Sequence, residues 1–233
     1  MSHPVLARLA SPDPEERSAA CRDAVDDPAA VVLVEALADA LGDPEKPVAR
    51  AASDALARLG RDHDVSRALR AALHSNPAAR RWYAARTLAR LEPPAPLLLP
   101  ALVEALGFPE AHVRWEAARL LVDTGRLHGE VLPLLLGLVR SAADPQQRAM
   151  AAHALRELAP DHPSCAAALL TASGDPERRV RRAALTALAG LLAAPPEVVA
   201  RLRELASGDP DAASRQLAAA ALDKLQSGSE SGR

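Results

Sequence analysis

Apolar residues recur three and four positions apart along most of the chain, which is the spacing that places them on one face of an α-helix. The helical stretches come in pairs, in which an apolar run such as 29–41, 95–106, 130–141 or 196–207 precedes a second, amphipathic run. A two-helix unit cannot bury its apolar face alone, so neighbouring units must stack. The pattern therefore predicts an all-α fold, a right-handed α-solenoid (superhelix) of about seven helical hairpins.

A helix-start signal divides the chain into these units. An Asp-Pro pair or a close relative returns at intervals of 30 to 36 residues. The side-chain oxygen of Asp or Asn can cap free backbone N–H groups, and proline at the first helical position loses no hydrogen bond. We expect the second helix of each unit to begin at these points, which are Asp13-Pro14, Asp43-Pro44, Asn76-Pro77, Phe108-Pro109, Asp144-Pro145, Asp175-Pro176 and Asp209-Pro210.

Inside the second helices, an arginine column gives a more regular register, at intervals of 32 to 34 residues and with Ala49 as its exception. Three residues after this column every unit has alanine, and seven residues after it nearly every unit has leucine, so these positions share one helical face. We expect the alanines to let neighbouring helices approach closely. They are Ala20, Ala52, Ala84, Ala117, Ala151, Ala184 and Ala218.

Composition narrows the possible partners and compartment. With 28 Lys and Arg against 30 Asp and Glu, the net charge of −2 gives no global attraction to nucleic acid or an anionic membrane. The start of the chain does not have the pattern of a signal peptide, and no apolar run reaches the length of a membrane span. Cys21 and Cys165 are far apart and outside any CxxC motif, so we expect small core thiols and a cytoplasmic location.

The repeated motif resembles the short bacterial HEAT-like repeats, also called phycobilisome-lyase-type HEAT repeats, whose pattern is Asp-Pro, Val-Arg, Ala and Ala-Leu. The segment 175–191, DPERRVRRAALTALAGL, is the best copy, whereas 108–121, FPEAHVRWEAARLL, lacks the Asp. The resemblance extends over residues 3–225 and implies one repeat domain. We expect residues 226–233 to form a disordered tail.

The resemblance also implies a role for the arginine column. In HEAT-like proteins this Arg and the capping Asp usually form a hydrogen-bonded ladder between successive repeats. In this chain the ladder would comprise Arg17, Arg81, Arg114, Arg148, Arg181 and Arg215 with Asp13, Asp43, Asp144, Asp175 and Asp209.

The family further implies that the second helices line a concave groove. Positions one and five after the arginine column lie roughly opposite the buried face, so their side chains would point into this groove. Both tryptophans of the chain occupy position one, and an arginine follows each of them by four residues. Exposed Trp and Arg are frequent binding hot spots, although the indoles could instead only fill the inner curve. The predicted groove residues are Trp82, Trp115, Arg86, Arg119, Arg50, Arg182 and His153.

These residues predict a non-catalytic scaffold that binds a peptide or protein, possibly an acidic one, in the groove. The sequence shows no phosphate-binding glycine loop, no GxSxG motif and no metal-ligand spacing among its seven histidines, so we expect no cofactor and no metal. An alternative is a DNA-binding or DNA-repair protein resembling the HEAT-like alkylpurine glycosylases, which the charge balance disfavours. A subunit of a bilin lyase is a further alternative. The polar outer face of the last helix favours a monomer.

Overall fold

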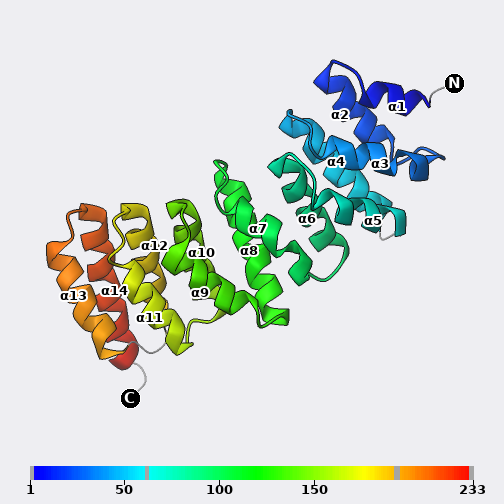
Figure 1. Cartoon of the computed structure of the whole chain (residues 1–233). Coiled ribbons are helices and arrows are strands. Elements are labelled where there is room, and N and C mark those ends of the chain that lie inside the picture. Colours follow the sequence, from blue (N-terminus) through cyan, green and yellow to red (C-terminus); the bar gives the residue numbers. More distant parts are fainter. Residues whose placement is uncertain (1–2, 61–62, 192–194, 231–233) are drawn as a thin grey trace. The chain divides into compact units, whose positions relative to one another are not determined.

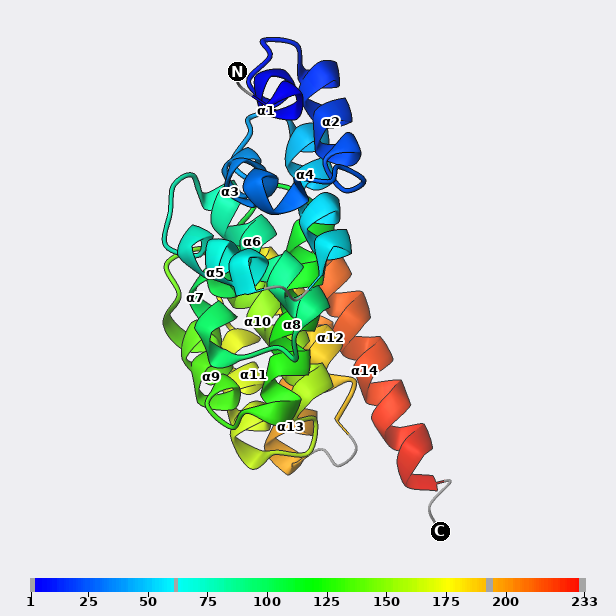
Figure 2. The same ribbon diagram turned by 90° about the vertical axis from the view of Figure 1, so that its right-hand side faces the viewer.

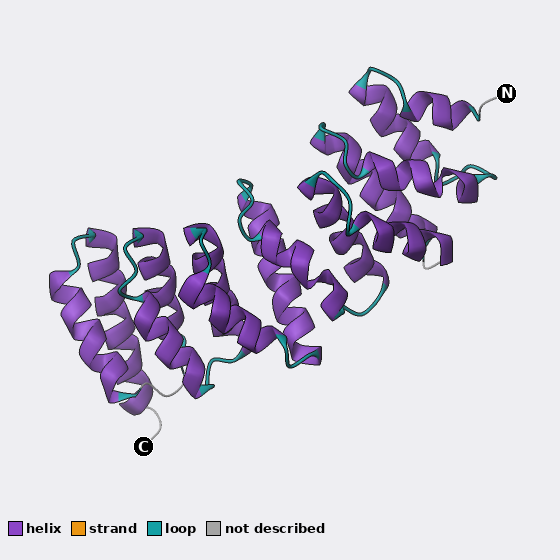
Figure 3. Cartoon of the chain, viewed as in Figure 1, coloured by secondary structure: helices purple, strands orange, loops and turns teal. Residues whose placement is uncertain are grey.

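The computed structural model describes residues 3–60, 63–191 and 195–230, and within these ranges the regular structure is entirely helical (Figures 1 and 3). The chain forms two compact units, which comprise Met1–Glu104 and Ala105–Arg233. The all-α prediction is confirmed.

Unit 1 is built from consecutive helical hairpins. Their helices are α1 (Pro4–Leu9), α2 (Pro14–Asp23), α3 (Ala30–Ala40), α4 (Lys46–Leu59), α5 (His63–Ala72) and α6 (Ala78–Leu91), followed by the 3₁₀ helix η1 (Pro96–Leu98) and α7 (Leu99–Ala105). The helices α1 and α2, α3 and α4, and α5 and α6 pack in pairs.

Unit 2 repeats the same arrangement. It contains α8 (Ala111–Leu127), α9 (Val131–Ser141), α10 (Pro145–Leu158), α11 (Pro163–Ala172), α12 (Arg178–Leu188), α13 (Pro196–Gly208) and α14 (Ala212–Glu230). The hairpins α9–α10, α11–α12 and α13–α14 stand side by side in chain order (Figure 1).

Each unit has two helical layers. In unit 1 the second helices α2, α4 and α6 pack on one another, and the first helices α1, α3 and α5 form the other layer. In unit 2 the second helices α8, α10, α12 and α14 do the same, and Figure 2 shows α12 and α14 on the side away from α9 and α11. Stacked hairpins of this kind are the solenoid architecture that the repeat predicts.

The alanine column is buried in the core. All seven of its members are 0% exposed. Leucines of the same helical face, such as Leu56, Leu121 and Leu155, are also 0% exposed. Cys21 and Cys165 are also fully buried, and burial raises the pKa of the Cys21 thiol to about 11. The sequence therefore identified this core correctly.

The Asp-Pro signals lie close to the observed helix starts. The helices α2 and α10 begin at the proline itself, and their caps Asp13 and Asp144 accept hydrogen bonds from the backbone N–H groups of Glu15 and Gln146. At the other five signals the helix begins one or two residues after the proline. There, Asp43, Asp175 and Asp209 still accept a hydrogen bond from the N–H group two residues on, in a turn that precedes the helix.

The arginine column holds these turns in place. In each of its six arginines, Nη1 donates to a backbone carbonyl six residues earlier, at distances of 2.6 to 3.0 Å. The rest of the guanidinium group reaches the next repeat, where Arg17 pairs with Asp43, Arg148 with Asp175 and Arg181 with Asp209.

The ladder departs from the expected pattern at two places. Arg81 pairs with Glu104, because the place of the capping Asp is taken by Phe108. The Nε atom of Arg114 is buried and has no hydrogen-bond partner among the described residues, while Asp144 caps its own helix. Arg215 belongs to the last repeat and holds only its own turn.

The C-terminal end of the chain differs from the expectation. The helix α14 continues to Glu230, so residues 226–230, which the composition assigned to a disordered tail, are helical. Residues 231–233 lie outside the described residues. A run of alanines before this segment favours helix, and a helix that has already started propagates at little cost.

Candidate interaction sites

The outer side of the second-helix layer carries the candidate site residues. We call this side, on α2, α4 and α6 in unit 1 and on α8, α10, α12 and α14 in unit 2, the second-helix face. Side chains five residues after the arginine column lie at least partly exposed on it, as in Arg22, Arg86 and Arg119. The second-helix face therefore presents the position-five column much as the register predicts.

The position-one column behaves differently, because it is buried in some repeats and exposed in others. Trp115 is 49% exposed, whereas Trp82 is only 2% exposed, and Ser18 and Ala149 in the same column are buried as well. The prediction that Trp82 faces an open groove is therefore wrong. The helix α6 packs against both α4 and α5.

Trp115 forms an aromatic pair with His153 in unit 2. Their ring centroids are 4.9 Å apart and the ring planes are inclined by 49°. Arg119 and Glu157 join them around a pocket of about 200 Å³ between α8 and α10, whose remaining lining is aliphatic. Arg119 is exposed and has no hydrogen-bond or ion-pair partner among the described residues. We call this the Trp115 pocket.

The imidazole of His153 is held neutral by its surroundings. Burial lowers its pKa below the ordinary value of about 6.5, and the nearby positive charge of Arg156 lowers it further, while Glu157 opposes both effects. At neutral pH the Trp115 pocket therefore presents an uncharged imidazole beside the indole, with Arg119 as its cation.

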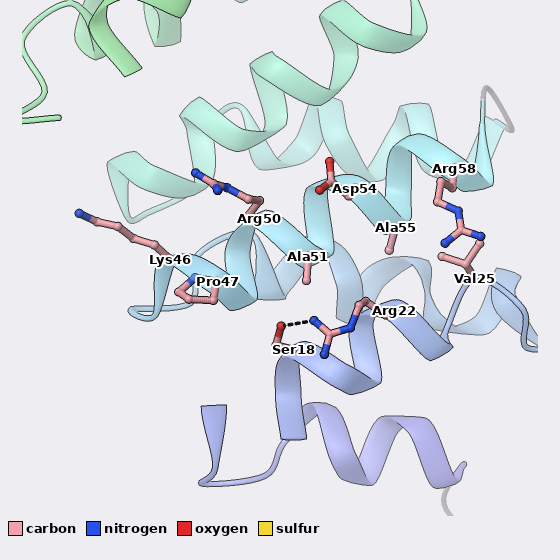
Figure 4. A pocket seen from close by; sticks show the side chains of 10 residues that line it. All are labelled: Ser18, Arg22, Val25, Lys46, Pro47, Arg50, Ala51, Asp54, Ala55 and Arg58. Carbon is pink, nitrogen blue, oxygen red and sulfur yellow. Dashed lines mark hydrogen bonds between the residues drawn. The ribbon is translucent and has the colours of Figure 1, made fainter. Parts of the chain in front are cut away.

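A second pocket, of about 480 Å³, lies between α2 and α4 in unit 1 (Figure 4). Its charged side chains are Arg22 from α2 and Lys46, Arg50, Asp54 and Arg58 from α4. Its remaining lining is Ser18, Val25, Pro47, Ala51 and Ala55. We call this the α2–α4 pocket.

The cations of the α2–α4 pocket outnumber its single carboxylate. Asp54 accepts a hydrogen bond of 2.7 Å from Arg90 of α6, so its charge is already compensated. Arg22 donates to the Ser18 hydroxyl at 2.9 Å, and Arg50 has no hydrogen-bond or ion-pair partner among the described residues. Arg58 lies 3.9 Å from Asp26 in a pair that is mostly exposed to solvent.

Sequence reasoning found Arg50 but not the other cations of the α2–α4 pocket. Two features of the sequence could have indicated these cations. Arg22 occupies the position-five column of the first repeat, and Lys46, Arg50 and Arg58 fall on one helical row at spacings of four residues.

The remaining predicted groove residues are engaged within the protein. Arg86 is half-buried and donates to the hydroxyl of Ser53 at 3.3 Å, and that hydroxyl also bonds Thr87 inside the layer. Arg182 forms a bidentate pair with Asp211, with hydrogen bonds of 2.8 and 2.6 Å. The prediction that Arg182 presents its charge to a partner is therefore not supported by its geometry.

Two further findings concern the described residues as a whole. No helix among them is long and apolar enough to cross a bilayer. Within the same ranges, His, Cys, Asp and Glu side chains form no group of three that could hold a metal ion.

Comparison with known proteins identifies the repeat. The family model of HEAT repeats matches residues 66–156, which run from α5 to α10. This segment consists of HEAT repeats. The resemblance that the sequence predicts is therefore confirmed, although the matched segment is less than half of the chain. No curated protein sequence matches the chain significantly.

Solved structures agree on the fold. The archaeal HEAT-like repeats protein from Thermococcus onnurineus NA1 is 16% identical with a TM-score of 0.54, and the alignment covers 96% of each chain. A Kap121p mutant is 16% identical with a TM-score of 0.58 over 97% of this chain, but the alignment covers only 30% of that protein. At these identities the likeness concerns the fold alone.

The phycocyanin lyase complex of CpcE and CpcF from Nostoc sp. PCC7120 is similar at 23% identity, with coverage of 95% and 93% of the two chains. Its TM-score is 0.41, which is too low to support a lyase function for this chain.

Proposed function

We propose that the chain is a non-catalytic interaction module that binds a peptide or protein segment through the Trp115 pocket. The observation that carries this proposal is the exposure of Trp115, which leaves 49% of the largest apolar side chain in water. Trp and Arg are frequent in binding hot spots, because an indole buries a large area with only two rotatable bonds and a guanidinium group pairs with carboxylates. The HEAT-repeat fold supports the same role, since stacked repeats offer extended binding surfaces.

The chemistry of the Trp115 pocket suggests what the bound segment contains. An aliphatic or aromatic side chain placed over the indole would bury apolar surface on both partners. A carboxylate beside it would pair with Arg119, which has no partner among the described residues. We therefore expect a segment that combines an apolar anchor with an acidic residue.

Selection from a random peptide library displayed on phage tests this proposal. The full chain is the bait, and the most enriched peptide is synthesised with a fluorescent label for anisotropy titration. Trp115→Ala should weaken binding by about 30-fold, the loss that a hot-spot residue of about 2 kcal/mol gives. Arg119→Gln should weaken it by about tenfold.

Matched controls lie on the same helix. Leu127 is 60% exposed on α8 but does not line the Trp115 pocket, so Leu127→Ala removes an exposed apolar side chain elsewhere. Arg126, paired with Asp123, offers the corresponding charge control as Arg126→Gln. If no enriched peptide distinguishes Trp115→Ala from Leu127→Ala, the proposal is refuted.

The alternative of a DNA-acting protein loses part of its basis. It drew on both tryptophans as aromatic residues of the groove, and Trp82 is buried. An electrophoretic shift with duplex DNA at about 50 mM salt, where phosphate contacts are strongest, is the direct test of this alternative. Binding that depends on Trp115 and Arg119 would favour it over the peptide.

A further inference from the structure

We propose that His153 completes a carboxylate-binding site in the Trp115 pocket, so that an acidic segment takes up one proton when it binds and is held more tightly at mildly acidic pH. This inference rests on the proposed function, because it concerns the same pocket, and it adds a residue that selects the charge of the ligand. The placement of an imidazole with unoccupied nitrogens beside the exposed indole carries it.

His153 lies on α10, which packs against α8, the helix of Trp115 and Arg119. Its ring centroid is 4.9 Å from that of the indole, and the three side chains line one pocket of about 200 Å³. The ring is half-buried, and neither of its nitrogens has a hydrogen-bond partner among the described residues. The imidazole therefore still has a donor and an acceptor to offer a ligand in this pocket.

The surroundings of His153 favour its neutral form when no ligand is bound. Burial lowers the pKa of the imidazole, and the positive charge of Arg156 lowers it further. Glu157 raises the pKa, but its effect is smaller, since its carboxylate is exposed and lies 3.5 Å from Arg156. The free pocket is therefore short of negative charge beside the imidazole.

The helices packed against α10 do not supply this negative charge. Among the lining residues, α8 contributes one charged side chain, the cation Arg119. The helix α11 has no charged side chain, and α9 has only Arg140, which is exposed. All four charged side chains of α12 are arginines. A carboxylate brought by a ligand would thus be the missing counter-charge.

A carboxylate bound beside Arg119 changes the balance at His153. A negative charge within about 4–6 Å favours the charged form of a basic group, so the pKa of His153 rises when the carboxylate binds. The indole adds to this effect, because a cation within about 6 Å of an aromatic ring centroid is attracted to the ring. The protonated imidazole then donates a charge-assisted hydrogen bond to the carboxylate.

The sign of the pH dependence follows from these two states. The pKa of His153 is lowered in the free chain and higher in the complex, so binding takes up a proton between the two values. Affinity should therefore increase as the pH falls through the bound-state pKa. Asp and Glu of the ligand remain mostly ionised down to about pH 5. Between pH 7.5 and 5.5 we expect binding to become about tenfold tighter, the factor that one pH unit of linked protonation gives.

A small probe tests the carboxylate site without a selected peptide. The full chain is titrated from pH 8 to 5 with and without 3-phenylpropionate at millimolar concentration, and the histidine ring protons are followed by NMR. His153→Gln identifies the resonance of His153 by its loss. The carboxylate probe should raise the pKa of His153, whereas the uncharged 3-phenylpropionamide should not. In Trp115→Ala the rise should disappear.

The peptide selected for the Trp115 pocket, chosen without histidine, gives the change in affinity. Its anisotropy is titrated at pH 7.5 and 5.5 at constant ionic strength, and circular dichroism verifies that each variant is folded at both values. His153→Gln should bind within about twofold at the two pH values. His112→Gln is the matched control, since His112 is exposed on α8 outside the pocket, and it should keep the tenfold change. Glu157→Gln should strengthen binding at both pH values by removing a like charge.

The outcomes separate this inference from the proposed function. Equal affinity of the folded wild type at both pH values, or the same pH dependence in His153→Gln, overturns the inference, while a loss in Trp115→Ala still supports the proposed function. If no selected peptide depends on Trp115, the proposed function fails and the probe decides alone. An unchanged pKa of His153 with 3-phenylpropionate, or an equal rise with 3-phenylpropionamide, then overturns the carboxylate site.

Discussion

The most quantitative prediction concerns the Arg181–Asp209 pair of the ladder. Arg181 donates to the two carboxylate oxygens through Nε at 2.9 Å and Nη2 at 3.1 Å, and the side chains are only 11% and 1% exposed. The same carboxylate accepts the backbone N–H group of Asp211 at 2.8 Å. Asp209→Asn removes the negative charge while keeping the shape of the side chain.

The expected cost follows from burial. Removing one partner of a buried ion pair typically costs about 3–5 kcal/mol, because the other charge is left uncompensated. Arg181 keeps its hydrogen bonds to the carbonyl oxygens of Asp175 and Pro176, so we expect a smaller loss of about 2–3 kcal/mol in the free energy of unfolding. The exposed pair Arg201–Glu204, with side chains 34% and 66% exposed, is the matched control, and Glu204→Gln should cost less than about 0.5 kcal/mol.

Urea unfolding followed by circular dichroism at neutral pH measures both free energies. Burial raises the pKa of Asp209, but the hydrogen bonds from Arg181 and from the Asp211 N–H group outweigh this, so the folded-state pKa lies below 3.8. The stabilisation is therefore fully present above about pH 4 and is lost as the pH falls through the lower folded-state pKa. A cost for Asp209→Asn no larger than that of Glu204→Gln, or a cost that persists unchanged at pH 2, would refute the reasoning.

Three further predictions concern other parts of the chain. In Trp82→Phe the remaining Trp115 should show red-shifted emission and strong acrylamide quenching, whereas Trp115→Phe should leave a blue-shifted, protected indole; equal quenching would contradict the assigned burial. The pKa of His153 is lowered in the fold, so stability should fall as the pH drops below about 6.5. His153→Gln should reduce that fall in melting temperature between pH 7 and 5, and an identical pH profile would exclude the histidine as its source. Gly60 has φ of 90°, so Gly60→Ala should cost about 1–2 kcal/mol in urea unfolding, and a neutral result would show that the turn rearranges.

Repeat register predicted the core with high accuracy because it depends on backbone geometry alone. The alanine column and the leucines after it lie on the face of each repeat's second helix that packs against the neighbouring helices. Their burial therefore follows from the helical period. The guanidinium contacts of Arg17, Arg148 and Arg181, whose Asp partners stand 26 to 28 residues further along the chain, agree with the ladder that the resemblance to HEAT-like repeats implies. Where Phe108 replaces that Asp, Arg81 takes Glu104 instead, which only the packed structure could indicate.

The binding surface was less predictable, because exposure on a helix depends on what the neighbouring helices carry. Trp82 and Trp115 share one column and the same flanking Arg and Ala, yet one is buried and the other is exposed. Sequence periodicity gives the direction in which a side chain leaves the helix axis. It does not give the fraction of that side chain which the neighbouring side chains cover.

The sequence by itself therefore determined the stacked helical hairpins, the starts of the second helices and the alanine and leucine core, since local capping and the helical period specify these. Tertiary structure decided which side chains remain available to a partner. It buried Trp82, paired Arg182 with Asp211, and left Arg50 and Arg119 without partners among the described residues. Those outcomes depend on side-chain sizes and charges contributed by different helices, which a single repeat does not contain.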